Sequence, residues 1–376
     1  MRPWFTLINT GTYLTVFMTL VIFTACSDTE PYKIGFIGSF TGQFADIGIA
    51  GRDGVILGIE EFNKNGGIKG KQVHLIIKNH HHDPKTAVQA MQEFAQEGVS
   101  GIIGPMTSTM ALILAPLADE LAIPMISPTA SSSELSGKKD FFLRVYPSNA
   151  HVAKNVAEYA ATLKGYTRIA VIYDTSNAGY SATLSRHFET FFTGYGGTIS
   201  VLTSYSTKDH PDFLQLTDQL LASAPDAIYI IAGARDTAMI CQQLAKRNER
   251  IPVLTSEWSI TPEIFNYGGD TINGVEFFQL FNPQDNSPKY IDFKKNYTHR
   301  FSHDPGFAPI HSYEATQVLL AALRKSTDPS TIPETITGIG TFHGLQNDFI
   351  INAFGDALRP YYLKAISDGT VITLKR

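Results

Sequence analysis

Hydroxyl groups and small residues gather in two loops that each follow a short apolar segment. Ser108 lies in the first loop, residues 105–109, and begins a stretch with helical spacing. The second loop, residues 128–133, reads Pro-Thr-Ala-Ser-Ser-Ser. A helix N-terminus offers free N–H groups and a partial positive charge, which together attract an anion. The two loops therefore form a candidate anion site. A helix cap at Ser108 and a solvated turn at 128–133 remain open as alternatives.

Acidic and aromatic side chains lie in other predicted loops. Glu257 and Trp258 are adjacent after a short strand, and Asp236 follows Arg235 after another strand. A partly desolvated carboxylate interacts strongly with a cation but gains little from water. Asp236 is a rival to Glu257 for that role, or a plain surface partner of Arg235. Trp258, like Phe44 in an earlier loop, could line a ligand site or pack into the core.

The elements that must position these residues alternate between strand, loop and helix. The alternation predicts an α/β fold in which parallel sheets are covered by helices on both faces. Ligands bind such sheets beyond the carboxyl ends of the strands, where the candidate loops are expected. We predict strands at residues 32–38, 73–78, 101–105, 123–127, 168–173, 198–203, 227–231, 361–366 and 370–374 and from 253, and helices at 49–63, 84–97, 108–121, 150–163, 213–223, 237–247, 290–301 and 313–324, with one more ending at 192.

The pattern restarts after residue 147, which predicts two Rossmann-like lobes of similar architecture. The residues after 278 contain few predicted strands, so we expect them to complete the two lobes rather than form a sheet of their own. Such a chain crosses between lobes several times and has a hinge beneath the cleft. We predict lobe 1 at residues 32–146 plus about 279–352, and lobe 2 at 147–278 plus about 353–376.

The N-terminus has the layout of a secretory signal. Arg2 precedes an uncharged run from residue 3 to 25, then Cys26 and a polar linker to residue 31. The segment Phe23-Thr24-Ala25-Cys26 resembles a bacterial lipobox, in which the cysteine is lipidated after cleavage of residues 1–25. An uncleaved membrane anchor is the alternative. Both interpretations place the rest of the chain outside the cytoplasm.

The composition and motifs of the chain argue against several classes of function. Hydrophobic residues make up 43% of the chain, the net charge is −5 and there is no basic block, which argues against a nucleic-acid partner. We find no nucleophile elbow, zinc-protease motif, paired C-x-x-C or P-loop, so we expect neither an enzyme nor a cofactor. Cys241 is expected to be a packed thiol. His80, His81 and His82 follow a predicted strand, and we expect a solvated loop there rather than a metal site.

Several short sequence motifs are distributed along the chain, and their residues and order are informative together. They include Ile34-Gly35-Phe36-Ile37-Gly38-Ser39-Phe40-Thr41-Gly42, Glu60-Glu61-Phe62-Asn63 running into Asn65-Gly66-Gly67-Ile68-Lys69-Gly70, Asp83-Pro84, Ile103-Gly104-Pro105, Ile126-Ser127-Pro128-Thr129-Ala130-Ser131, Ala170-Val171-Ile172-Tyr173-Asp174 and Tyr313-Glu314-Ala315. With these motifs the chain resembles the branched-chain amino-acid-binding group of type I periplasmic binding proteins. The resemblance implies a lipoprotein receptor that closes around an amino acid or a similar small carboxylate. It also implies an ABC permease in the inner membrane as partner and a lipid anchor in the membrane.

The resemblance also implies roles for individual residues. Ser108 corresponds to the serine that binds the ligand carboxylate. In the second loop, Thr129 offers its backbone and Ser131 its hydroxyl, with Ala130 between them. Glu257 aligns with the acid that pairs with the ligand's α-ammonium group.

One departure from the family pattern affects the expected ligand. The family tyrosine would fall at Ala178, and Tyr180 is expected to serve in its place. This change leaves open an aromatic or other non-amino-acid carboxylate as the ligand. A sensing module that passes closure to a signalling partner is a further alternative function.

Overall fold

The computed structural model describes Met1 and residues 30–374. The chain divides into a unit of Met1–Pro31 and a unit of Tyr32–Arg376, and the second unit carries the sheets and the helices. The predicted signal segment after Met1 and the predicted lipidation site at Cys26 lie outside the described residues. Within the described part of the chain, no helix combines the length and apolar character needed to cross a bilayer.

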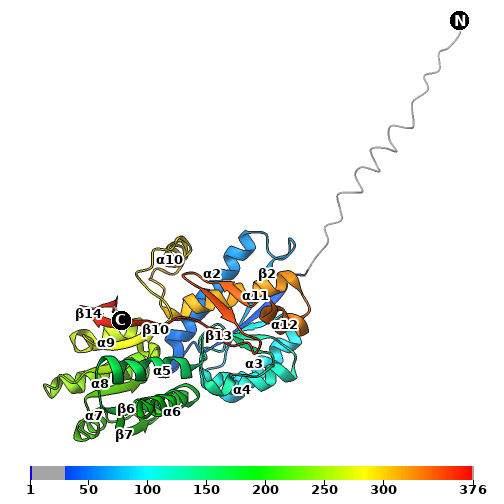
Figure 1. The fold of residues 1–376 in the computed structure, drawn as a ribbon. Helices are drawn as coiled ribbons and strands as arrows, with labels where there is room; N and C mark the ends of the chain where they lie inside the picture. The colour runs from blue at the N-terminus through cyan, green and yellow to red at the C-terminus, as the bar shows by residue number, and fades with distance from the viewer. Residues whose placement is uncertain (2–29, 375–376) are drawn as a thin grey trace. The chain divides into compact units, whose positions relative to one another are not determined.

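The first sheet is entirely parallel, with the strand order β2-β1-β3-β4-β5. Adjacent residues of its strands face opposite sides, so Ile34 packs with helices α2 and α11 whereas Ile37 packs with α3 and α4. Figure 1 shows the ribbons of these four helices. The helices therefore cover both faces, as the alternating pattern predicts. The elements are β1 (Tyr32–Gly38), α2 (Ala45–Lys64), β2 (Val73–Asn79), α3 (Pro84–Glu97), β3 (Ile102–Ile103), α4 (Ser108–Glu120), β4 (Met125–Ser127), β5 (Phe142–Arg144) and α11 (Phe307–Lys325).

The second sheet has the order β15-β14-β10-β9-β8-β6-β7. Strands β6 to β10 pair in parallel, and β14 adds antiparallel to β10. Ile169 packs with α5 and α6, and Ile172 packs with α8 and α9 on the other face. The elements are α5 (Asn149–Glu158), β6 (Arg168–Asp174), α6 (Ala178–Gly194), β7 (Thr198–Tyr205), α7 (Phe213–Ala222), β8 (Ala227–Ile231), α8 (Ala234–Lys246), β9 (Val253–Thr255), α9 (Pro262–Gly268), β10 (Glu276–Gln279), β14 (Tyr362–Ser367) and β15 (Thr370–Thr373).

A third, small sheet forms near the C-terminus, and the expectation that residues after 278 form no sheet of their own was wrong. Its antiparallel strands are β11 (Thr341–His343), β12 (Asp348–Ile351) and β13 (Ala357–Leu358). Phe342 and Phe349 stack in it with ring centroids 5.8 Å apart and join the core of α2 and α11. Each of these short strands has exposed residues, whereas the similarly short β3 and β4, which the sequence predicted, are wholly buried.

The remaining helices also belong to the first sheet's side. Residues of α10 (Pro288–Phe301) and α12 (Ile332–Ile339) join the hydrophobic cluster of α2 and α11. We define lobe 1 as residues 32–144 and 288–358, and lobe 2 as residues 149–279 and 362–373. The chain passes between the lobes at residues 145–148, 280–287 and 359–361.

Candidate ligand-binding site

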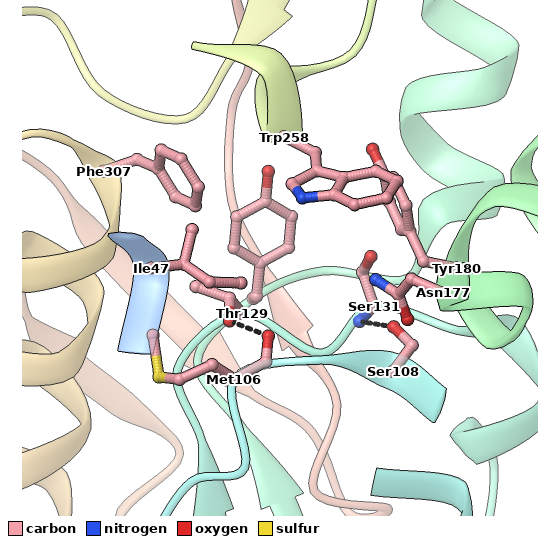
Figure 2. A pocket seen from close by; sticks show the side chains of 10 residues that line it. Ile47, Met106, Ser108, Thr129, Ser131, Asn177, Tyr180, Trp258 and Phe307 are labelled. Atoms are coloured by element: carbon pink, nitrogen blue, oxygen red, sulfur yellow. Dashed lines mark hydrogen bonds between the residues drawn. The ribbon is translucent and has the colours of Figure 1, made fainter. Parts of the chain in front are cut away.

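A cavity lies between the two lobes (Figure 2). Its lining comes largely from the loops that follow β3, β4, β6 and β9, which are the carboxyl ends of parallel strands. The lining residues are Ile47, Met106, Ser108, Thr129, Ser131, Tyr146, Asn177, Tyr180, Trp258 and Phe307. The structure therefore brings together residues from both halves of the chain.

Ser108 connects the two hydroxyl-rich loops. Its Oγ accepts hydrogen bonds from the N–H groups of Ser131 at 3.0 Å and Ser132 at 3.2 Å. The residue that caps α4 is Thr107, so the alternative of Ser108 as the cap of its own helix was wrong. Because the Ser108 oxygen accepts both of these bonds, its own proton remains available to a ligand in the cavity.

Ser131 and Asn177 add two further uncharged donors near Ser108 (Figure 2). The Ser131 Oγ is buried and has no hydrogen-bond partner among the described residues. The Asn177 Oδ1 accepts from the N–H of Thr109 at 3.1 Å, which leaves its NH₂ group free to donate elsewhere. Two hydroxyls, one amide and the start of α4 can together solvate a carboxylate.

Thr129 and Ala130, in the same loop, offer no side-chain donor to a ligand. The Thr129 hydroxyl donates to the carbonyl of Met106 at 2.5 Å, so its side chain lines the cavity with its proton already used. Ala130 is fully buried, its N–H donates to Ser127 Oγ at 3.0 Å, and it does not line the cavity.

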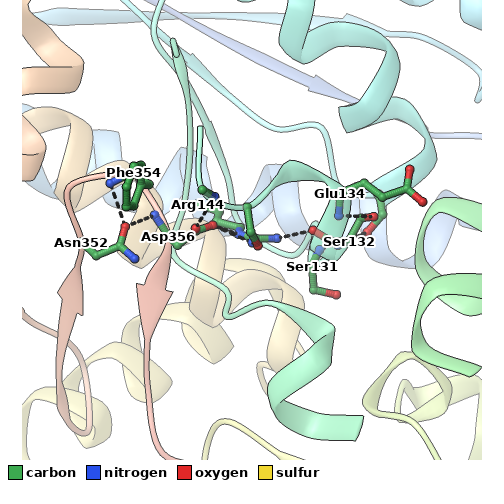
Figure 3. Close-up of polar contacts among 10 residues, drawn as sticks. Ser131, Ser132, Glu134, Arg144, Asn352, Phe354 and Asp356 are labelled. Atoms are coloured by element: carbon green, nitrogen blue, oxygen red, sulfur yellow. Dashed lines mark hydrogen bonds and ion pairs between the residues drawn. The ribbon is translucent and has the colours of Figure 1, made fainter. Parts of the chain in front are cut away.

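A buried arginine that the sequence did not single out holds this loop from behind (Figure 3). Arg144 donates to the carbonyl of Ser132 at 2.8 Å and pairs with Asp356 at 2.6 Å. Its side chain is only 1% exposed. Since Asp356 lies between β12 and β13, the small third sheet helps to fix the position of the second loop.

Aromatic rings form one wall. Trp258 and Tyr180 meet edge to face with centroids 5.9 Å apart, and both line the cavity. Phe44 stacks on Trp258 at 6.0 Å and also contacts the ring of His82, but it does not line the cavity itself. Phe44 therefore supports the wall, and Trp258 and Tyr180 present it to a ligand.

Glu257 lies outside the lining although it is adjacent to Trp258. It is 4% exposed, and its Oε2 accepts a hydrogen bond from the hydroxyl of Tyr146. Burial raises the pKa of Glu257 to about 7. Tyr146 does line the cavity. Tyr146 was not predicted from the sequence, because strand β5, which ends at Arg144, was missed as well.

Asp236 also lies outside the lining. It is 5% exposed and accepts hydrogen bonds from Tyr205 at 3.1 Å and from Thr207 at 2.5 Å. Burial raises its pKa. Arg235 lies over the ring of Tyr267, 6.0 Å from its centroid, so the surface-pair alternative does not describe its position.

The lobes contact each other on more than one side of the cavity. Gln43 Nε2 donates to Asp174 Oδ2 at 2.7 Å, and the N–H of Gly179 donates to Thr109 Oγ1 at 3.1 Å. His187 and Ser133 lie 2.7 Å apart between ring Nε2 and Oγ. These bonds connect lobe 1 with lobe 2, so this arrangement of the lobes is a closed one.

The three histidines are not the solvated loop that we expected. His80 is 1% exposed and His82 is half-buried, so only His81 faces solvent. Burial lowers the pKa of His80 to about 4. The described residues contain no group of three or more His, Cys, Asp or Glu side chains suited to a metal ion. Cys241 is a buried free thiol, as predicted, and burial raises its pKa to about 12.

Known proteins resemble this chain along most of its length. The family model described as periplasmic binding protein matches residues 31–370. A Leu/Ile/Val-binding protein of Rhizobium johnstonii is 25% identical over 245 residues, which is 65% of this chain and 66% of that protein. Because the alignment spans just under two thirds of that relative, it does not assign the relative's substrate to this chain.

Solved structures share the fold. A leucine-binding protein from Thermotoga maritima has a TM-score of 0.84 at 26% identity, covering 92% of this chain and 98% of that one. A solute-binding protein from R. palustris in complex with benzoate has a TM-score of 0.81 at 17% identity, covering 92% and 96% of the two chains. The resemblance seen in the sequence is thereby confirmed, and the chain belongs to the periplasmic binding protein family.

Proposed function

We propose that this protein is the extracytoplasmic solute-binding receptor of an ABC importer and that it captures a small carboxylate in the cavity between its lobes. The observation that carries this proposal is the group of uncharged donors at the start of α4. Ser108 and Ser131 both have a hydroxyl proton that no described residue accepts across the cavity, and Asn177 has a free NH₂ group. The family is one of solute-binding proteins that act outside the cytoplasm, which agrees with this role.

The proposed mechanism is closure about the chain segments that join the lobes. The carboxylate binds first to lobe 1 at Ser108 and Ser131. Lobe 2 then closes and brings Asn177, Tyr180 and Trp258 to the ligand. A ligand favours closure only through contacts that it gains in the closed state, and these three residues supply such contacts.

The relatives support two ligand classes. The names of the R. johnstonii and T. maritima proteins refer to branched-chain amino acids, and the R. palustris structure holds benzoate. An amino acid and an aromatic carboxylate share the carboxylate group that the Ser108 site fits. The permease partner and lipid anchoring at Cys26 remain part of the proposal.

A thermal-shift screen of the purified full-length protein tests the proposal. The panel contains amino acids, aliphatic and aromatic acids, and the primary amide of each acid. A carboxylate that binds the native state raises the melting temperature by mass action, and its amide, which lacks the negative charge of the carboxylate, should raise it far less. Equal shifts for acid and amide, or no shift with any acid, would contradict a carboxylate site.

A further inference from the structure

The described residues that line the cavity carry no charged side chain. None of the ten is Asp, Glu, Lys, Arg or His. A carboxylate can still be stabilised there, because hydroxyl and amide donors and the N-terminus of α4 converge near Ser108. An ammonium group has no anionic partner among these side chains, so only neutral oxygens would compensate for the hydration that it loses.

Glu257, the acid that resembles the family's ammonium partner, already has a partner within the protein. Its Oε2 accepts the hydroxyl proton of Tyr146. The Gln279 side chain and the Leu280 N–H also lie against the carboxylate, and the charge of Arg359 acts on it. Its Oε1 is buried and has no hydrogen-bond partner among the described residues, but Glu257 itself does not line the cavity.

Tyr146 stands where it can control access to this acid. It lies in the segment that joins β5 to α5, and it lines the cavity whereas Glu257 does not. The Tyr146 side chain is also fixed from the lobe 1 side, where its ring meets that of His311 edge to face at 5.3 Å. The tyrosine hydroxyl therefore occupies the Oε2 oxygen of Glu257, and Tyr146 rather than Glu257 faces the cavity.

We propose that the cavity selects a small carboxylate with an apolar body and no α-ammonium group, and that Tyr146 sets this selection by occupying the Glu257 carboxylate. This inference rests on the proposed function, because it concerns the same cavity and the same carboxylate site. The apolar body of the ligand packs against the wall of Trp258 and Tyr180 and the side chains of Ile47 and Phe307.

Matched ligand pairs test the selection by calorimetry with the full-length protein. In each pair the molecules differ only in the α-amino group: 3-phenylpropanoate against phenylalanine, and 4-methylpentanoate against leucine. We expect the acid without the amine to bind more tightly by about tenfold or more, because the amine is desolvated without a counter-charge. An amino acid that binds as tightly as its partner, through Glu257 or through the aromatic faces of the wall, overturns the proposal.

Two variants separate the role of Tyr146 from that of the cavity as a whole. Tyr146→Phe keeps the ring and frees Glu257, so it should raise amino-acid affinity relative to the matched acid by about fivefold. Tyr195→Phe, at an exposed tyrosine directly after the end of α6, is the control and should leave the ratio unchanged. An unchanged ratio in a folded Tyr146→Phe protein contradicts the assignment to Tyr146.

Glu257→Gln provides a test that does not depend on the folding of Tyr146→Phe. The glutamine can still accept the tyrosine proton, and the proposal expects both members of each pair to keep their affinities within about twofold. A loss confined to the amino acids would show that Glu257 binds an ammonium. If no carboxylate of either kind binds, the proposed function itself fails, whereas preferred binding of amino acids removes only the selection by Tyr146.

Discussion

Gln43 and Asp174 lie 131 positions apart in the chain, and the amide of one donates to the carboxylate of the other at 2.7 Å. The same Gln43 nitrogen reaches Ser176 Oγ at 2.8 Å and Thr207 Oγ1 at 3.1 Å. Gln43 belongs to lobe 1 and its three partners belong to lobe 2. The contact therefore exists only when the lobes are together, next to the loop that carries Asn177.

Removing this contact should weaken ligand binding without unfolding either lobe. Gln43→Ala takes a hydrogen bond to a carboxylate out of the closed state, and we expect the dissociation constant to rise about fivefold, or ~1 kcal/mol. Calorimetry with the best ligand of the screen measures it. Gln89→Ala is the matched control, because Gln89 bonds only to Glu93 within the same helix among the described residues. Equal constants for the two variants would exclude a role for Gln43 in closure.

The two serines of the proposed carboxylate site should differ in their effect on stability. Ser131→Ala removes a hydroxyl without a protein partner among the described residues, so it should cost about 1–2 kcal/mol of binding and little stability. Ser108→Ala should cost similar binding and also about 1–3 kcal/mol of stability, because two buried N–H groups lose their acceptor. Ligand-free thermal unfolding and calorimetry separate the two effects. Unchanged affinity in both variants would remove these serines from the site.

Glu257 should make the protein less stable as the pH rises toward neutrality. Burial raises its pKa from 4.5 to about 7 in the folded state, so folding favours the protonated form. The unfavourable contribution is absent below pH 4.5, grows between pH 4.5 and about 7 and is constant above. Urea unfolding across this range should show a slope that Glu257→Gln removes. The exposed Glu249→Gln serves as control, and a wild-type slope in Glu257→Gln would contradict the assignment.

A buried ion pair between α11 and the residue that follows β13 should be costly to break. Arg359 Nη1 lies 2.6 Å from Glu314 Oε2, and both side chains are at most 6% exposed. Arg359→Met leaves the Glu314 charge buried without its partner, which should cost about 3–5 kcal/mol in chemical unfolding. Adding Glu314→Gln should restore part of the loss. A single variant within ~1 kcal/mol of wild type would show that the pair contributes little.

Because of the ion pair between Arg359 and Glu314, we also expect the protein to lose stability in acid. Burial acts to raise the pKa of Glu314, but the charge of Arg359 together with the hydrogen bonds from His311 and Arg359 outweighs it, and the pKa falls to about 2. The stabilisation is therefore complete above pH 4.5 and is lost as the pH falls toward about 2. This window lies below that of Glu257. In unfolding experiments below pH 4.5, the free energy of unfolding of Glu314→Gln should fall less steeply with decreasing pH than that of the wild type. An identical fall in both proteins would argue against this contribution.

Trp258 offers a direct optical test of where the ligand binds. The chain has two tryptophans, and Trp4 lies outside the described residues. In a Trp4→Phe protein, emission comes from Trp258 alone, which lines the cavity. A bound solute changes the surroundings of the indole, so the emission should change with saturation. Binding that leaves the spectrum unaltered would place the solute elsewhere.

The sequence predicted the bounds of those elements whose first and last residues are typical of helix ends. Helix α3 begins and ends where we expected because Asp83 caps it, Pro84 occupies its first position and Gly98 ends it with a φ of 68°. Strands β5 and β10, of three and four residues, were missed. Their place is fixed by pairing with strands that are distant in sequence.

The residues of the candidate site could likewise be predicted only where a local sequence pattern marks them. Ser108 and Ser131 could be found because hydroxyls in small-residue loops after strands form a local pattern. Ile47 and Phe307 look like ordinary core residues in the sequence, and only the packing of α2 and α11 brings them to the cavity. The hydrogen bond between Tyr146 and Glu257 joins residues 111 positions apart, and no local sequence pattern predicts it.

Strand β14 has a consequence for how the molecule is made. It is an interior strand that pairs with β10 on one side and β15 on the other, although α10, α11, α12 and the third sheet lie between β10 and β14 in the sequence. Until Ser367 has been synthesised, β10 has an open edge whose N–H and C=O groups can recruit another chain. A nascent or truncated polypeptide that ends before β14 is therefore prone to aggregate through β10, and a chaperone that shields this edge must act until β14 has emerged.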